Sequence, residues 1–241
     1  EEKTFTTLTL PVVTTNTIAN VTNTSAVCSG TVVSDGGTNI TSRGFCYSTN
    51  HNPTVSDNRS AASSSGTGNY TCNISTFSPR TTYYIRAYAT NSVGTSYGAE
   101  MTFTTLDLPN VVSDSVFGIT PVSARCAGRV LNDGGAPITA RGFCYGRTSM
   151  PVVRTDSVVL ASSNGTGAFS CNITGLDTGV TYYVRAFATN SVGTNYGVQM
   201  TFTTKYLPYV LIDIITNVTN SSANSSTRCS SSSLHGRVRT E

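Results

Sequence analysis

The chain has 241 residues, of which only 11% are charged, and its formal net charge is +3. A typical globular chain has about 25% charged residues. Lys and Arg are scattered, which argues against nucleic acid as a partner, and no stretch approaches the roughly 18 apolar residues of a membrane span. With 31 Ser and 41 Thr, many β-branched residues and few helix formers, the composition predicts an all-β, secreted, structural protein and makes a conventional enzyme a poor interpretation.

Short runs of β-branched and aromatic residues alternate with turn signals such as Asp35-Gly36-Gly37. Six such runs in the first hundred residues predict strands. Their spacing is typical of a sandwich of two sheets, and no segment has the apolar period of a helix. The expected strands cover residues 12–18, 26–33, 39–48, 68–75, 81–91 and 96–104.

The same pattern occurs twice. Residues 43–47, Arg-Gly-Phe-Cys-Tyr, recur at 141–145, and residues 89–95 recur at 188–194. A repeat of about 98 residues is a normal size for one small domain. The predicted organisation is an orphan last strand or N-terminal arm at residues 1–9, two domains at 10–106 and 107–205, and, at 206–241, an orphan first strand with a Ser-rich tail that would be donated to another subunit.

The end of each repeat carries a family resemblance. Residues 83–91, Tyr-Tyr-Ile-Arg-Ala-Tyr-Ala-Thr-Asn, closing on Gly94, are similar to the sixth strand of a fibronectin type III domain. Phe77, Pro79 and Tyr83 resemble that family's tyrosine corner. The family's buried Trp is missing, since the chain has no Trp.

This resemblance implies an all-β fold of tandem immunoglobulin-like (fibronectin type III-like) β-sandwiches with extra strands at both termini. Similar repeats are common in secreted and surface proteins of Bacteroidota bacteria. The family serves as spacers, adhesion modules and fibre subunits alike, so the resemblance is specific for fold and not for function.

Cysteines recur with the repeat. Cys28 and Cys46 are 18 residues apart on the second and third expected strands, as are Cys126 and Cys144. We expect Cys28–Cys46 and Cys126–Cys144 disulfides, which suit a small domain in an oxidising compartment. One alternative is a Cys28–Cys72 disulfide inside one sheet. A second and simpler alternative is that the cysteines are buried free thiols.

Eleven of the 19 Asn residues lie in Asn-x-Ser/Thr motifs, against about six expected by chance at this Ser and Thr content. Alternation places Asn69, Asn73 and Asn172 on the outward face of their strands. Two Asp-Ser-Val segments resemble a bacterial O-glycosylation pattern. Covalent glycans would help to keep such a charge-poor surface soluble. The candidate sites are Asn20, Asn23, Asn39, Asn58, Asn69, Asn73, Asn164, Asn172, Asn217, Asn220, Ser115 and Ser157.

Motifs of catalysis and of metal binding are missing from the sequence. The only histidines, His51 and His235, lie outside any nucleophile or zinc motif. Asp35 and Asp133 stand in Gly-rich turns, where turn chemistry explains them. We therefore expect no catalytic residue, no metal and no cofactor apart from glycans. Two functions stay open: a subunit of an extracellular fibre, and an adhesive or carbohydrate-binding spacer of a larger secreted or surface protein.

The terminal segments predict how such a fibre would assemble. Residues 4–8 repeat the last strand of each domain, and residues 209–216 correspond to a first strand. The latter is apolar on both faces, which favours burial between layers. The expected partners are copies of the chain, joined by strand addition, or flanking repeats of one array. The predicted assembly residues are Val210, Leu211, Ile212, Ile214, Ile215 and Phe5.

Overall fold

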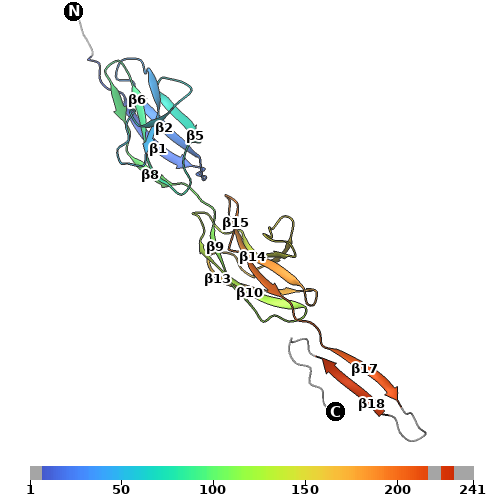
Figure 1. Cartoon of the computed structure of the whole chain (residues 1–241). Helices are drawn as coiled ribbons and strands as arrows, with labels where there is room; N and C mark the ends of the chain where they lie inside the picture. Colours follow the sequence, from blue (N-terminus) through green and yellow to red (C-terminus); the bar gives the residue numbers. More distant parts are fainter. Residues whose placement is uncertain (1–6, 217–223, 231–241) are drawn as a thin grey trace, which may run out of the picture. The chain divides into compact units, whose positions relative to one another are not determined.

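The computed structural model describes residues 7–216 and 224–230. These residues form strands and no helix, and so no helix that could cross a membrane is found among them. The all-β fold class predicted from the sequence is confirmed. The strands group into two sandwiches and a hairpin (Figure 1).

The first sandwich contains eight strands, β1 (Val12–Ala19), β2 (Ala26–Ser34), β3 (Ser42–Ser48), β4 (Asn58–Ala61), β5 (Gly68–Ile74), β6 (Thr82–Thr90), β7 (Thr95–Tyr97) and β8 (Met101–Thr104). One sheet has the order β1-β2-β5. The other has the order β4-β3-β6-β7, and β8 also pairs with β6.

The second sandwich repeats this topology with sheets β9-β10-β13 and β12-β11-β14-β15, and β16 pairs with β14. Its strands are β9 (Asn110–Phe117), β10 (Ser123–Asn132), β11 (Ala140–Gly146), β12 (Ser157–Leu160), β13 (Gly167–Thr174), β14 (Thr181–Thr189), β15 (Thr194–Tyr196) and β16 (Met200–Thr203). The tail strand predicted as an orphan, β17 (Tyr209–Thr216), is instead paired with β18 (Asn224–Ser230) in a separate hairpin.

Alternation along the strands builds the core of the first sandwich. Every second residue of β2 and of β5 is buried, and these side chains pack against Phe45 of β3 and Ile85 of β6. The tyrosine corner is also present. The Tyr83 hydroxyl accepts a hydrogen bond from the Ser78 N–H at 3.0 Å. The equivalent Tyr182 accepts one from the Asp177 N–H at 3.1 Å.

Two strand predictions were wrong in detail. The four-residue edge strand β4 was missed because its residues are mostly polar and exposed, so it has no apolar pattern. The run predicted at 96–104 is two strands, β7 and β8. They are separated at Gly98, where a Cβ atom would lie only 2.6 Å from the backbone nitrogen and hydroxyl of Thr15.

A hydroxyl connects the two sheets of each sandwich. Thr15 lies at a bulge in β1, and its Oγ1 accepts a hydrogen bond from the buried Ala87 N–H of β6 at 3.0 Å. In the second sandwich the Ser113 hydroxyl accepts one from the buried Ala186 N–H, also at 3.0 Å. Each bond satisfies a backbone donor that would otherwise be buried without a partner.

A buried Asn ties together three segments at one end of the first sandwich. The side-chain NH₂ of Asn91 donates to the carbonyl oxygens of Thr9 and Asp35, at 2.7 and 2.8 Å. Its Oδ1 accepts from the N–H groups of Val93 and Gly94. We call this four-bond arrangement the amide clamp. It uses the full donor capacity of the side chain, which explains how so polar a group is buried.

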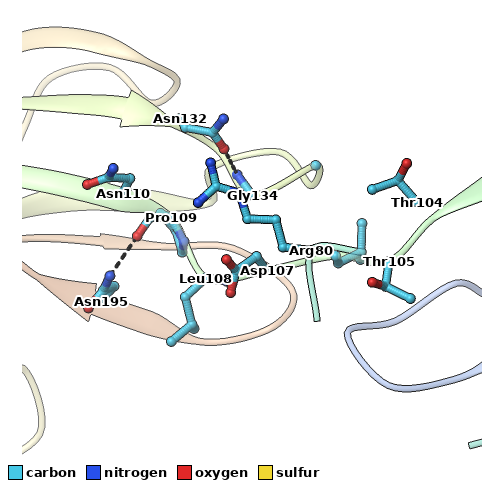
Figure 2. Close-up of a pocket in the computed structure, with 12 residues that line it drawn as sticks. Arg80, Thr104, Thr105, Asp107, Leu108, Pro109, Asn110, Asn132, Gly134 and Asn195 are labelled. Carbon is cyan, nitrogen blue, oxygen red and sulfur yellow. Dashed lines mark hydrogen bonds between the residues drawn. The ribbon is translucent and has the colours of Figure 1, made fainter. Parts of the chain in front are cut away.

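The second sandwich has the same amide clamp. Asn190 donates to the carbonyl oxygens of Asp107 and Asp133, at 2.7 Å each. Figure 2 shows two further bonds beside it: the Asn132 side chain accepts from the Gly134 N–H at 2.6 Å, and Asn195 donates to the Pro109 carbonyl oxygen at 2.8 Å. The Asp-Gly-Gly turn is therefore held through the carbonyl oxygen of Asp133 and the N–H of Gly134.

A buried Arg explains the Gly66-Thr67-Gly68 motif. Arg43 is 6% exposed, and its guanidinium donates to four carbonyl oxygens, those of Ser64 and of the three motif residues, at 2.8 to 3.2 Å. It also lies 4.9 Å from the centre of the Tyr70 ring. In the second sandwich Arg141 makes the equivalent bonds. The motif therefore supplies carbonyl oxygens that bind the guanidinium of a buried arginine, and we call this set of oxygens the carbonyl cradle.

Candidate assembly and modification sites

The titratable groups of the described residues have structural roles. No group of three or more His, Cys, Asp or Glu residues that could hold a metal is found among them. Asp35 Oδ1 accepts from the Gly37 N–H at 2.9 Å, and Asp133 does the same for Gly135, so both complete their turns as predicted. His235 lies outside the described residues.

His51 forms an exposed pair with Glu100, in which Nδ1 and Oε1 are 2.8 Å apart. Hydrogen bonds from the Asn52 N–H and then from His51 lower the pKa of Glu100. In the second repeat a neutral residue, Gln199, accepts the corresponding bond from the Met150 N–H. Because a neutral amide serves equally well, the pair supports the loop backbone and gives no sign of catalysis.

The predicted Cys28–Cys46 and Cys126–Cys144 disulfides are not present, since all six cysteines up to Cys171 are free and buried. The prediction was wrong because Cys46 does not face the core. Its neighbours Phe45 and Tyr47 belong to the core, whereas Cys46 lies on the other face of β3, with its sulfur 3.2 Å from the Pro53 carbonyl oxygen.

Cys144 has the same placement, 3.1 Å from the Pro151 carbonyl oxygen, so neither favoured pair is possible without reversing a strand. Burial raises the pKa of Cys46 and of Cys144 to about 11. Burial, with a smaller contribution from Cys72, raises the pKa of Cys28 to about 12. The thiols are therefore protonated and poor nucleophiles in the folded chain.

The placement of the Asn-x-Ser/Thr motifs agrees with the outward phase predicted from alternation. Asn69, Asn73 and Asn172 are exposed, on the face opposite the buried residues of β5 and β13. The accessible candidates are Asn20, Asn39, Asn58, Asn69, Asn73, Asn164, Asn172, Ser115 and Ser157, and Asn23 is partly buried. Asn217 and Asn220 lie outside the described residues. The attachment of sugar stays a prediction.

The hairpin β17–β18 has the register of β1–β2. Val13 pairs with Val32 in β1–β2, and Val210 pairs with Cys229 in β17–β18, a shift of 197 residues on both strands. By this register Cys229 takes the position of Val32, and the position of Cys28 is taken by Ser225. The hairpin therefore has the backbone pattern of the first two strands of a sandwich. Among the described residues β18 lacks the third strand that β5 supplies to β2.

Two positions of β17 differ chemically from both earlier repeats. Ile212 stands where β1 has Thr15, the residue whose hydroxyl joins the sheets. Ile214 stands where β1 has Thr17, an exposed position that hydrogen-bonds to Ser29 of β2. In β9 the same two positions are again hydroxyl residues, Ser113 and Ser115. The other predicted assembly residues, Val210, Leu211 and Ile215, also belong to β17, and Phe5 lies outside the described residues.

No family model matches the chain, and no curated protein matches it. Among solved structures it is similar to the FN1–FN3 domains of chicken CNTN1, with 15% identity over 81% of this chain and 68% of that chain, at a TM-score of 0.35. It is also similar to the sensor domain of the anti-sigma factor RsgI4 of Pseudobacteroides cellulosolvens, with 21% identity over 43% of this chain and 100% of that chain, at a TM-score of 0.32. The sheet order and the buried core define the fold of each sandwich.

Proposed function

We propose that the chain is a non-enzymatic extracellular structural protein, a glycosylated subunit of a fibre that assembles head to tail through its terminal strands. A fibronectin type III-like fold of this kind suggests a module of a larger surface or extracellular protein. The finer proposal rests on one observation, the replacement of two hydroxyl residues by Ile212 and Ile214 in a hairpin that has the register of β1–β2.

In an isolated hairpin these two replacements would carry an unfavourable free energy. Position 17 is exposed in β1, and an isoleucine in its place would put a large apolar group in water. Burial of such a side chain contributes about 1.5–3 kcal/mol, so a partner surface that covers it gains free energy. Among the described residues β18 pairs only with β17, so its other edge would offer backbone groups to an added strand. A contact of this kind between copies does not close on itself and therefore extends into a filament.

Other partners are flanking repeats of the same array, in which β17–β18 would begin a further ordinary sandwich. The second function is an adhesive or carbohydrate-binding spacer, for which the adjacent tyrosines Tyr83-Tyr84 and Tyr182-Tyr183 would offer a sugar-stacking face. The ring of Tyr84 is already covered by His51, whose centre lies 3.8 Å from it. That contact favours the structural role over the binding one. The resemblance to repeats of secreted and surface proteins of Bacteroidota agrees with an extracellular location.

A double variant distinguishes assembly of separate subunits through β17 from a continuous array of flanking repeats. In Ile212→Thr/Ile214→Thr, β17 receives hydroxyl residues like those of β1. A subunit that assembles through β17 should then form few or no filaments in negative-stain images and should elute as a monomer. Leu160→Thr, which alters an exposed leucine of β12, is the matched control and should leave filaments unchanged. Filaments of normal length from the double variant would refute assembly through β17.

A further inference from the structure

The two sandwiches share a pair of facing cysteines that differs from the pair favoured by the 18-residue spacing in the sequence. In the register of β2 and β5, Cys28 lies directly opposite Cys72, and in β10 and β13 Cys126 lies directly opposite Cys171. All four are buried residues on inward positions of their strands. The same pair therefore occurs twice, at equivalent places in two independent cores.

Opposed residues of an antiparallel pair have Cα atoms about 4.5–5.5 Å apart, which is within the range of about 4.4–6.8 Å found across disulfides. Their side chains also leave the sheet on the same face, as a bridge requires. Cys46 and Cys144 fail this second condition, because each lies on the outer face of its sheet against a proline carbonyl oxygen.

We propose that Cys28–Cys72 and Cys126–Cys171 are oxidation sites, each converted to a cross-strand disulfide by exchange with a small-molecule or protein disulfide, and that Cys46 and Cys144 stay reduced. The structure corresponds to the dithiol form of both sites. This inference concerns the interior of each sandwich and does not depend on the proposed assembly.

The oxidation of each pair proceeds by two successive thiol–disulfide exchanges. One thiol of the pair, for example Cys72, attacks the carrier disulfide as a thiolate and forms a mixed disulfide while one carrier thiol leaves. The Cys28 thiolate then attacks the Cys72 sulfur, the bond between Cys28 and Cys72 forms, and the second carrier thiol leaves. Two electrons and two protons pass from the pair to the carrier.

The timing follows from burial. Cys28 and Cys126 have no exposed surface, and desolvation raises the pKa of each to about 12. A carrier therefore reaches the pair while the chain folds, before the sheets close over it. Once made, the bond is shielded in the same way from reductants.

The test uses the full chain with Cys229→Ser, which removes the seventh thiol from competition. The reduced, unfolded protein is refolded in a buffer of glutathione and glutathione disulfide. It is then unfolded again in denaturant without reductant, so that buried free thiols are reached, blocked with a maleimide and measured by intact mass and peptide mapping. Two bridges make the polypeptide about 4 Da lighter, since each removes two hydrogens. We expect maleimide on Cys46 and Cys144 alone, and cross-linked peptides that join 28 to 72 and 126 to 171.

A second variant, Cys46→Ala/Cys144→Ala in the same background, repeats the test without the outer thiols. All four remaining cysteines should then be protected from maleimide. Any bridge that contains Cys46 or Cys144 would overturn the proposal, as would maleimide on four or more thiols of the refolded chain. Refolding with a reductant in place of glutathione disulfide is the control and should leave every thiol open to the reagent.

Discussion

Exchanging Asn91 for Asp changes one NH₂ group to an oxygen and so tests the amide clamp at constant shape. The NH₂ group donates to the carbonyl oxygens of Thr9 and Asp35 at 2.7 and 2.8 Å. In Asn91→Asp these two oxygens would face a carboxylate oxygen. The other oxygen would keep its bonds from Val93 and Gly94.

The cost is set by two lost hydrogen bonds in a buried place. Each contributes about 1 kcal/mol net, and leaving its acceptor without a donor adds to this, so we expect a loss of about 3 kcal/mol at pH 7. For a domain of this size about 1 kcal/mol moves the midpoint by roughly 4–8 °C. The melting temperature of the first sandwich should therefore fall by about 12–24 °C.

The loss should depend on pH with a defined sign. Burial and two facing carbonyl oxygens favour the neutral acid, so the introduced carboxyl should have a higher pKa in the folded state than in the unfolded state. The folded variant then takes up the proton first as the pH falls. Its deficit against wild type should be largest at pH 7 and should shrink towards pH 4.5.

Differential scanning calorimetry of wild type, Asn91→Asp and Asn91→Ala at both pH values measures this. The alanine variant loses all four bonds of the clamp without adding a titratable group, so its deficit should be the same at both pH values. Asn39→Asp places the same charge at an exposed position and should change little. A midpoint for Asn91→Asp within about 3 °C of wild type at pH 7 would refute the clamp as a stabilising contact.

Two further pairs of substitutions, each a test and its matched control, address the other buried contacts. Arg43→Met removes the cation from its carbonyl cradle and should destabilise the first sandwich by about 2–4 kcal/mol in urea unfolding, whereas Arg59→Met on the exposed strand β4 should cost under about 0.5 kcal/mol. Gly134→Ala and Gly175→Ala are matched at φ 74°, but only at Gly134 would the new Cβ meet a backbone oxygen, 2.1 Å away on Asp107. We expect Gly175→Ala to cost about 1 kcal/mol and Gly134→Ala at least twice that, and equal costs would contradict the close approach of the turn.

The sequence was sufficient for the features that depend on local pattern. Alternation correctly placed Cys28 and Cys72 inward and Asn69 and Asn73 outward, because β2 and β5 each have one buried and one exposed face. The tyrosine corner was implied by the resemblance of Phe77, Pro79 and Tyr83 to fibronectin type III domains, and the hydrogen bond from the Ser78 N–H to the Tyr83 hydroxyl agrees with it.

The sequence failed where long-range contacts override the pattern. β3 is buried on both faces, because Pro53 and its loop cover the outer one, and so alternation does not reveal that Cys46 points away from the core. The carbonyl cradle of Arg43 was missed for a different reason. Its acceptors are backbone oxygens, which leave no residue type to recognise. The only sign was that Arg43-Gly44 and Gly66-Thr67-Gly68 recur together in both repeats.

The hydroxyl that joins the sheets bears on whether β17–β18 begins a third sandwich like the other two. In both sandwiches a buried backbone N–H, of Ala87 or of Ala186, is satisfied by a Thr or Ser hydroxyl. Ile212 has no group to accept such a bond. A strand like β6 packed on β17 would therefore keep a buried donor without this acceptor, at a cost of about 1–3 kcal/mol. A partner surface that offers apolar side chains at this position avoids that cost. We therefore expect the hairpin to pack against a surface that differs from the one that covers β1 and β9 in the first two sandwiches.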